Sequence, residues 1–293
     1  MNPAIGLFVG LTLFSTMLAL GLGLRSEALG QWFRQPDLPL RILIGSCLLV
    51  PLLALLLLQT PWGGQLSTPA RYAIALMGLC PSAPLALRKA RRLGADHQLT
   101  ALVQVAAALA AIGTVPMLGM AFRNSFGVSG WQIHPLDVAL QVGRVQVLPL
   151  LLGLGLRHRW PTLAERLEAP LTRLAQGLLL TLLALVLIKS APLLLRFVPA
   201  NLPALPLMAV MAALALLIGR SMAAGSPEHG VAAGLVTAMR NPGLALLLAD
   251  RHGQDVAGLR LAILLHVLVT VVVSAVWLRL EKPRSSAGTP TPG

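Results

Sequence analysis

Charged residues are scarce in this sequence, at 11% of 293 residues, against about 25% in a typical soluble domain. So low a fraction excludes a soluble enzyme and an intrinsically disordered chain, since both depend on charged groups in water. Cysteine is scarcer still. Cys47 and Cys80 stand alone in apolar runs, which excludes a disulfide scaffold and leaves no metal-binding spacing.

What the sequence does contain is apolar, with 56% hydrophobic residues and a mean hydropathy of +0.78. The apolar runs are continuous rather than alternating, which favours membrane helices over the strands of a barrel. The first run has no basic start and is long enough to span a bilayer, so it is not expected to be a cleavable signal peptide. The composition therefore predicts an all-α polytopic membrane protein.

Nine apolar segments are predicted to cross the membrane, because each approaches the roughly 20 residues that a span requires. They cover approximately residues 3–24, 40–58, 69–92, 97–121, 135–156, 172–190, 204–222, 230–252 and 256–279. Residues 1–280 are accordingly expected to form a single transmembrane domain. The polar tail 281–293 is expected to be disordered in the cytoplasm.

The basic residues predict the orientation, because Lys and Arg collect on the cytoplasmic side of membrane proteins. With the N-terminus outside, 15 lie on the inner side: Arg25, Arg34, Arg41, Arg88, Lys89, Arg91, Arg92, Arg157, Arg159, Arg166, Arg173, Arg220, Arg279, Lys282 and Arg284. Only 5 lie outside, and Arg144, Arg240 and Arg260 lie within spans. The sequence thus predicts an inner (plasma) membrane protein with a cytoplasmic C-terminus. Its basic excess is attributed to topology and not to nucleic acid.

Two of the predicted spans are interrupted. Pro81 and Pro84 fall within the third, at about 69–92, and Pro242-Gly243 breaks the eighth, at about 230–252. The two run in opposite directions, as expected of inverted repeats whose first copy lacks its opening helix. Broken helices in matching places of two halves indicate a transporter site at the midplane.

The ordered motifs resemble the bile acid:sodium symporter family. These are 14–27 (FSTMLALGLGLRSE), the break at 78–84 (GLCPSAP), the turn at 94–96 (GAD), 147–153 (VLPLLLG) and the crossover at 240–246 (RNPGLAL). The resemblance implies a panel domain beside a core domain in which the two broken helices cross. It also implies a secondary transporter of small organic anions that is coupled to sodium. Sodium or a proton is the expected coupling ion, and no other cofactor is expected.

The same resemblance implies two sodium sites whose ligand positions have degenerated. The corresponding residues are Ser46, Ala86, Leu87, Thr100, Gln104, Val236, Met239 and Arg240. Ala86 and Leu87 cannot coordinate through their side chains, and Val236 stands where the family has an acid. Hard cations take several oxygen ligands, so coordination would fall to Thr100, Gln104 and backbone carbonyls near Thr237 and Met239.

Losing a carboxylate at 236 and gaining a guanidinium at 240 adds two positive charges, as many as two sodium ions carry. We therefore hypothesise that Arg240 permanently replaces sodium. The 10 acidic residues all fall in loops or at span ends, so Arg240 and Arg144 need other partners: an anionic substrate or carbonyls at the breaks. The candidate substrate-binding residues are Arg240, Asn241, Arg144, Thr237, Pro81 and Ser82.

Three functions follow from this reading. The first is organic-anion transport by alternating access, independent of sodium. The second is conventional sodium symport, and the third is a non-transporting receptor or scaffold. A membrane enzyme is discounted, because acids at span depth are lacking and His266 is isolated. His266 is either a core histidine or, without sodium, a proton carrier.

Overall fold

The computed structural model describes residues 3–25, 30, 34, 36–82, 97–126, 135–223, 227–253 and 255–280. Within these ranges the regular structure is helical, and a single β-bridge joins Ser82 to Arg240. This confirms the predicted all-α polytopic class. Residues 83–96, with Ala86 and Leu87, and the tail 281–293 lie outside the described residues.

The helices follow the predicted spans closely. They are α1 (Pro3–Gly23), α3 (Asp37–Ile44), η1 (Gly45–Leu49), α4 (Val50–Gln59), α5 (Pro61–Gly64), α6 (Thr68–Leu79), α8 (His97–Phe126), α9 (Pro135–Val142), η2 (Gly143–Val147), α10 (Leu148–Arg159), α11 (Pro161–Ala200), α12 (Ala204–Met222), α13 (Pro227–Ala238), α14 (Pro242–His252) and α15 (Leu259–Leu280). Helix α11 extends beyond the predicted 172–190 at both ends and runs for 40 residues.

Seven segments of the described chain are helical, long and apolar enough to cross a membrane. The predicted third and eighth spans are not among them, because their helices are short. Helix α6 ends at Leu79, and α13 and α14 contain 12 and 11 residues on either side of residues 239–241. The interruptions therefore lie where Pro81 and Pro242 remove backbone donors.

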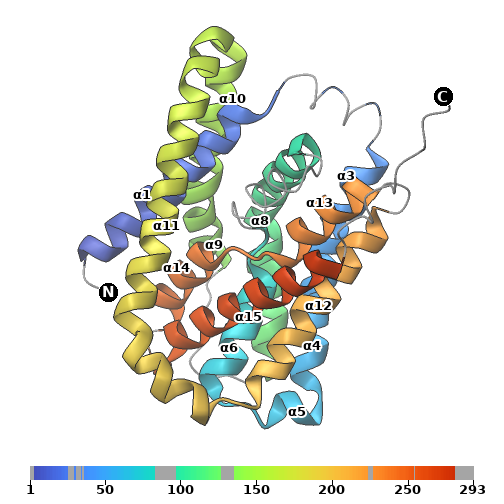
Figure 1. Cartoon of the computed structure of the whole chain (residues 1–293), viewed down its shortest axis with the longest axis vertical. Coiled ribbons are helices and arrows are strands. Elements are labelled where there is room, and N and C mark those ends of the chain that lie inside the picture. Colours follow the sequence, from blue (N-terminus) through green and yellow to red (C-terminus); the bar gives the residue numbers. More distant parts are fainter. Residues whose placement is uncertain are drawn as a thin grey trace, which may run out of the picture.

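The helices form two groups: Figure 1 shows α1, α10 and α11 along one side of the molecule and α3, α4, α12 and α13 along the other. A panel bundle consists of α1, α11 and the span formed by α9, η2 and α10, and a core bundle consists of α3, α4, α6, α8 and α12–α15; α9 also packs against α8. In the panel, α1 and α10 cross at Gly21 and Gly153: a Cβ added at either glycine would lie 3.0 Å from the other's Cα. The crossing thus depends on two residues without side chains.

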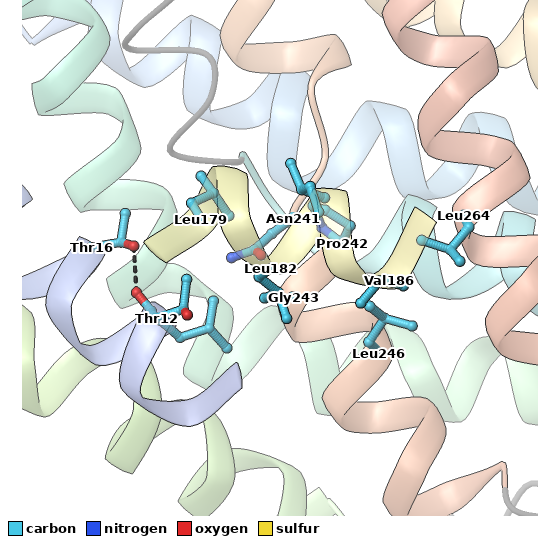
Figure 2. Close-up of a pocket in the computed structure, with 12 residues that line it drawn as sticks. Thr12, Thr16, Leu179, Leu182, Val186, Asn241, Pro242, Gly243, Leu246 and Leu264 are labelled. Atoms are coloured by element: carbon cyan, nitrogen blue, oxygen red, sulfur yellow. Dashed lines mark hydrogen bonds between the residues drawn. The ribbon is translucent and has the colours of Figure 1, made fainter. Parts of the chain in front are cut away.

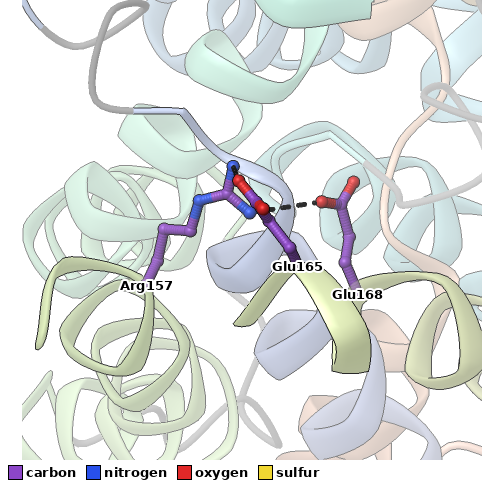
Figure 3. Close-up of polar contacts among 3 residues, drawn as sticks. All are labelled: Arg157, Glu165 and Glu168. Carbon is purple, nitrogen blue, oxygen red and sulfur yellow. Dashed lines mark hydrogen bonds and ion pairs between the residues drawn. The ribbon is translucent and has the colours of Figure 1, made fainter. Parts of the chain in front are cut away.

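One end of the panel is held by an arginine between two carboxylates (Figure 3). Arg157 is near the end of α10. Its Nη2 lies 3.6 Å from Oε1 of Glu165 and its Nη1 lies 3.4 Å from Oε2 of Glu168, both on α11. Glu168 also packs against Gly23 at the end of α1. The cluster therefore joins all three spans of the panel at the turn that follows Arg159.

Two spans contain a π-helical turn ahead of a proline. Each π-turn begins with a glycine that is followed six residues later by a proline. These are Gly45 and Pro51 for η1, and Gly143 and Pro149 for η2. Each proline lacks an N–H and crowds the preceding turn, and the widened turn relieves that conflict. The π-turn consequently leaves backbone carbonyls available to other donors.

Candidate transport site

The two helix breaks meet inside the core. Ser82 pairs with Arg240 in an antiparallel bridge, and the backbone N–H of Asn241 donates to Pro81 O at 3.1 Å. Extended backbone from one break thus crosses extended backbone from the other. Unpaired backbone is not tolerated in lipid, and pairing the two breaks satisfies part of it.

Arg240 lies at this crossing and is almost fully buried, with 3% of its surface exposed. Its guanidinium donates to four backbone carbonyls: Nε to Met77 O at 3.0 Å, Nη1 to Ser46 O at 2.9 Å and Thr237 O at 3.3 Å, and Nη2 to Gly78 O at 2.6 Å. Nη1 also reaches Ser46 Oγ at 3.0 Å. The side chain therefore caps the backbone and does not project into an open cavity.

The breaks and the π-turn explain why three of these carbonyls are available. Met77 O would bond the N–H of residue 81, and in the π-turn Ser46 O would bond that of residue 51, but both residues are proline. Thr237 O would bond the N–H of Asn241, which is directed to Pro81 O instead. Helix C-terminal ends carry partial negative charge, so Arg240 occupies the place where a cation is most favourable.

The other described residues at the predicted sodium-site positions are buried, and some have polar side-chain atoms without a hydrogen-bond partner in the described part of the chain. Val236 and Met239 belong to an apolar cluster that includes Val103 of α8. Thr100 is fully buried. The side-chain oxygen and nitrogen of Gln104 are buried and have no hydrogen-bond partner among the described residues, and the same holds for the hydroxyls of Thr237 and Ser82. Ser46 is engaged by Arg240, and Ala86 and Leu87 lie outside the described residues.

A pocket opens beside the crossover, between the panel and core bundles (Figure 2). Its core side is formed by Asn241, Pro242 and Gly243 at the start of α14, with Leu246 and Leu264. Its panel side is formed by residues of α1 and α11: Thr12, Leu13, Thr16, Leu179, Leu182, Leu183 and Val186. The lining is apolar except for two threonines and one asparagine.

The polar groups of this pocket come from two helices. Asn241 caps α14, its Oδ1 accepting from the N–H of Leu244 at 3.1 Å. The hydroxyls of Thr12 and Thr16 donate to carbonyls one turn earlier, at Phe8 and Thr12. The α14 N-terminus, with its partial positive charge, thus faces an otherwise apolar space, an arrangement suited to an anion on an apolar body.

The structure brings only some of the predicted substrate-binding residues to this pocket. Asn241 lines it, whereas Arg240 lies behind it on the carbonyls described above. Arg144 is exposed on η2 and is not among the lining residues, so its part in substrate binding stays a prediction. Sequence reasoning did not single out Thr12 and Thr16, although two threonines one turn apart in an apolar span were a usable signal.

The fold and the pocket define a multi-pass membrane transporter with a crossover of broken helices. Residues 10–197 match the Sodium Bile acid symporter family, and this chain belongs to that family. Members of the family are transporters and not enzymes. A comparison with curated proteins finds no match. The family match covers most of the panel and α3–α8, and it ends before α12–α15.

Proposed function

We propose that this protein carries small organic anions across the plasma membrane by alternating access, and that Arg240 supplies the charge that sodium supplies in a conventional symporter. The observation that carries the proposal is the placement of the buried guanidinium on three carbonyls at the two breaks and on one in the π-turn η1. Those oxygens are the ligand type that a hard cation uses, and here a permanent cation takes them.

The substrate class follows from the pocket between the bundles. The chemistry of the lining, which is apolar with two hydroxyls, one amide and a helix N-terminus, matches a carboxylate or similar anion joined to an apolar body. Arg240 immediately precedes Asn241 in the sequence, and its fixed positive charge adds to the attraction for an anion. Bile-acid-like and smaller carboxylates share this chemistry.

A second candidate is sodium-coupled uptake of the same anions. It is favoured by the buried polar atoms of Gln104, Thr237 and Ser82, which have no partner among the described residues. Oxygens of this type are the ligands that a hard cation such as sodium takes. A receptor or scaffold role is the third candidate, and it differs from both in producing no flux.

Uptake into proteoliposomes tests the proposal directly. We expect labelled organic carboxylates to accumulate at the same initial rate with and without a sodium gradient. A parallel run with a proton gradient identifies proton coupling. Sodium-stimulated uptake would overturn the role given to Arg240 and favour the second candidate. Specific binding of a carboxylate without flux under any gradient would favour the receptor.

A further inference from the structure

Helix α15 carries a row of buried polar side chains that the transport site does not use. His266, Thr270 and Ser274 are spaced four residues apart, so they lie on one face of the helix. Their exposed fractions are 1%, 4% and 0%. The opposite face carries Val271, Val272 and Val276, among other exposed apolar residues suited to lipid. The polar row therefore points into the core bundle.

Each of these side chains has a polar atom without a partner in the described part of the chain. The atoms are His266 Nδ1, Thr270 Oγ1 and Ser274 Oγ. Serine and threonine hydroxyls in membrane helices commonly donate to a carbonyl one turn earlier, as Thr12 and Thr16 do on α1. Those of Thr270 and Ser274 do not, and so remain available to another molecule.

The spacing of the row suits water. Residues four apart on a helix are separated by about 6 Å along its axis, which is too far for a direct hydrogen bond between hydroxyls. A single water molecule between two such groups satisfies both. Leaving the groups dry would cost each of them its desolvation free energy.

The two ends of the row give it a direction. At one end, Leu264, two residues before His266, lines the pocket together with Asn241, the residue that follows Arg240. At the other, Trp277 lies one turn beyond Ser274 and packs on α13: a Cβ added at Gly234 would be 3.0 Å from Cη2 of the indole. The row thus runs from the crossover to the indole of Trp277, near the C-terminal end of α15.

We propose that His266, Thr270 and Ser274 bind a row of water molecules that provides a solvent route between the crossover and the C-terminal end of α15, with Trp277 closing that end. The route lies within the core bundle and is separate from the panel–core pocket. This proposal does not depend on which anion the protein carries, and its tests do not measure transport.

Cysteine accessibility tests this route in the Cys47→Ala/Cys80→Ala background, reconstituted in nanodiscs. Only an ionised thiol reacts with methanethiosulfonate ethylammonium, so reaction requires water. We expect Ser274→Cys to react at least tenfold faster than Ala262→Cys, a buried apolar position on α15, and Val272→Cys, on its exposed face. Adding Trp277→Ala should raise the Ser274→Cys rate further. Equal rates at positions 274 and 262 would overturn the proposal.

A second measurement uses the unmodified side chains and covers the case in which a cysteine variant does not fold. Radiolysis of bound water oxidises adjacent residues, so His266 should be labelled despite its burial. Thr270→Val/Ser274→Ala should lower that labelling at least fivefold. An unlabelled His266, or labelling unchanged in the double variant, would show that the row is dry.

Discussion

Arg240 is the residue on which the transport proposal depends. A buried charge is tolerated only where it is paired or well hydrogen-bonded, and here the pairing is entirely to neutral oxygens. Hydrogen bonds to a charged group are worth about 1.5–3 kcal/mol each, so the guanidinium also holds the broken ends of α6 and α13 together. A lysine ammonium lacks the planar fork needed to reach carbonyls from three segments.

The first prediction exchanges this guanidinium for a sodium site. Arg240→Gln should lower anion uptake at least tenfold, because the carbonyls lose their cation. Adding Val236→Glu restores the acid that the family resemblance places there, so Val236→Glu/Arg240→Gln should regain uptake only in sodium. Initial rates in proteoliposomes measure both effects.

The matched control is Arg260→Gln, because Arg260 is half-exposed and pairs with Asp250 at a helix end. It makes the same chemical change and should leave uptake within twofold of the unmodified protein. Full activity of Arg240→Gln without added sodium would contradict the assigned role.

The second prediction separates the two roles of Asn241. Asn241→Ala removes the cap of α14 and should cost about 1 kcal/mol of stability. Asn241→Asp retains the cap but places a carboxylate in the pocket, where it repels an anion. We therefore expect Asn241→Asp to keep the thermal midpoint and raise the KM for the anion at least tenfold. An unchanged KM would remove Asn241 from the substrate site.

At the scale of the elements, the effects of proline explain which features of the helices could be predicted from the sequence and which could not. The interruptions at Pro81 and Pro242 follow from missing backbone donors, and these residues are visible in the sequence. The π-turns at η1 and η2 were not predicted, although both precede a proline, because most prolines in membrane helices produce only a kink. The length of α11 was underestimated because Pro170 and Pro192 lie inside a continuous helix.

The partners of Arg240 could not be predicted from the sequence. The sequence showed that a deep arginine lacks a deep carboxylate, and left open whether an anion or carbonyls would satisfy it. Choosing between these needs the distance between α6, η1 and α13, which are separated by up to about 190 residues along the chain. Such contacts depend on how helices pack and not on any local pattern.

The third prediction concerns the crossing of α1 and α10. Gly153→Ala places a Cβ against the backbone of Gly21 and Leu22, and overpacking of this kind costs about 1–3 kcal/mol. Its control, Gly155→Ala, lies on the same helix with nothing within 4 Å of the added carbon. The control should be neutral or stabilising, because alanine is the better helix former. Thermal midpoints in detergent decide between them, and equal midpoints would mean that α1 and α10 do not cross so closely.

At the scale of the whole molecule, the pocket lies where the two bundles meet. Among the described residues, Gln141 of α9 donates a hydrogen bond from the panel to Leu247 O of α14 in the core, at 3.3 Å. The pocket itself is lined mostly by apolar side chains, and Leu13 of α1 lies against Gly243 of α14. A largely apolar lining lets one bundle shift against the other, as alternating access requires.

The last prediction tests that movement with a cross-link. A Cβ added at Gly243 would lie 3.3 Å from Cγ of Leu13, so cysteines at both positions come within reach of a disulfide. In the Cys47→Ala/Cys80→Ala background, oxidised Leu13→Cys/Gly243→Cys should lose at least 90% of its uptake (roughly a tenfold fall, or about 1.4 kcal/mol) and regain it on reduction. Each single-cysteine variant controls for the substitution itself. Because the bridge joins panel to core across the pocket, undiminished transport with the disulfide fully formed would show that the bundles need not separate there.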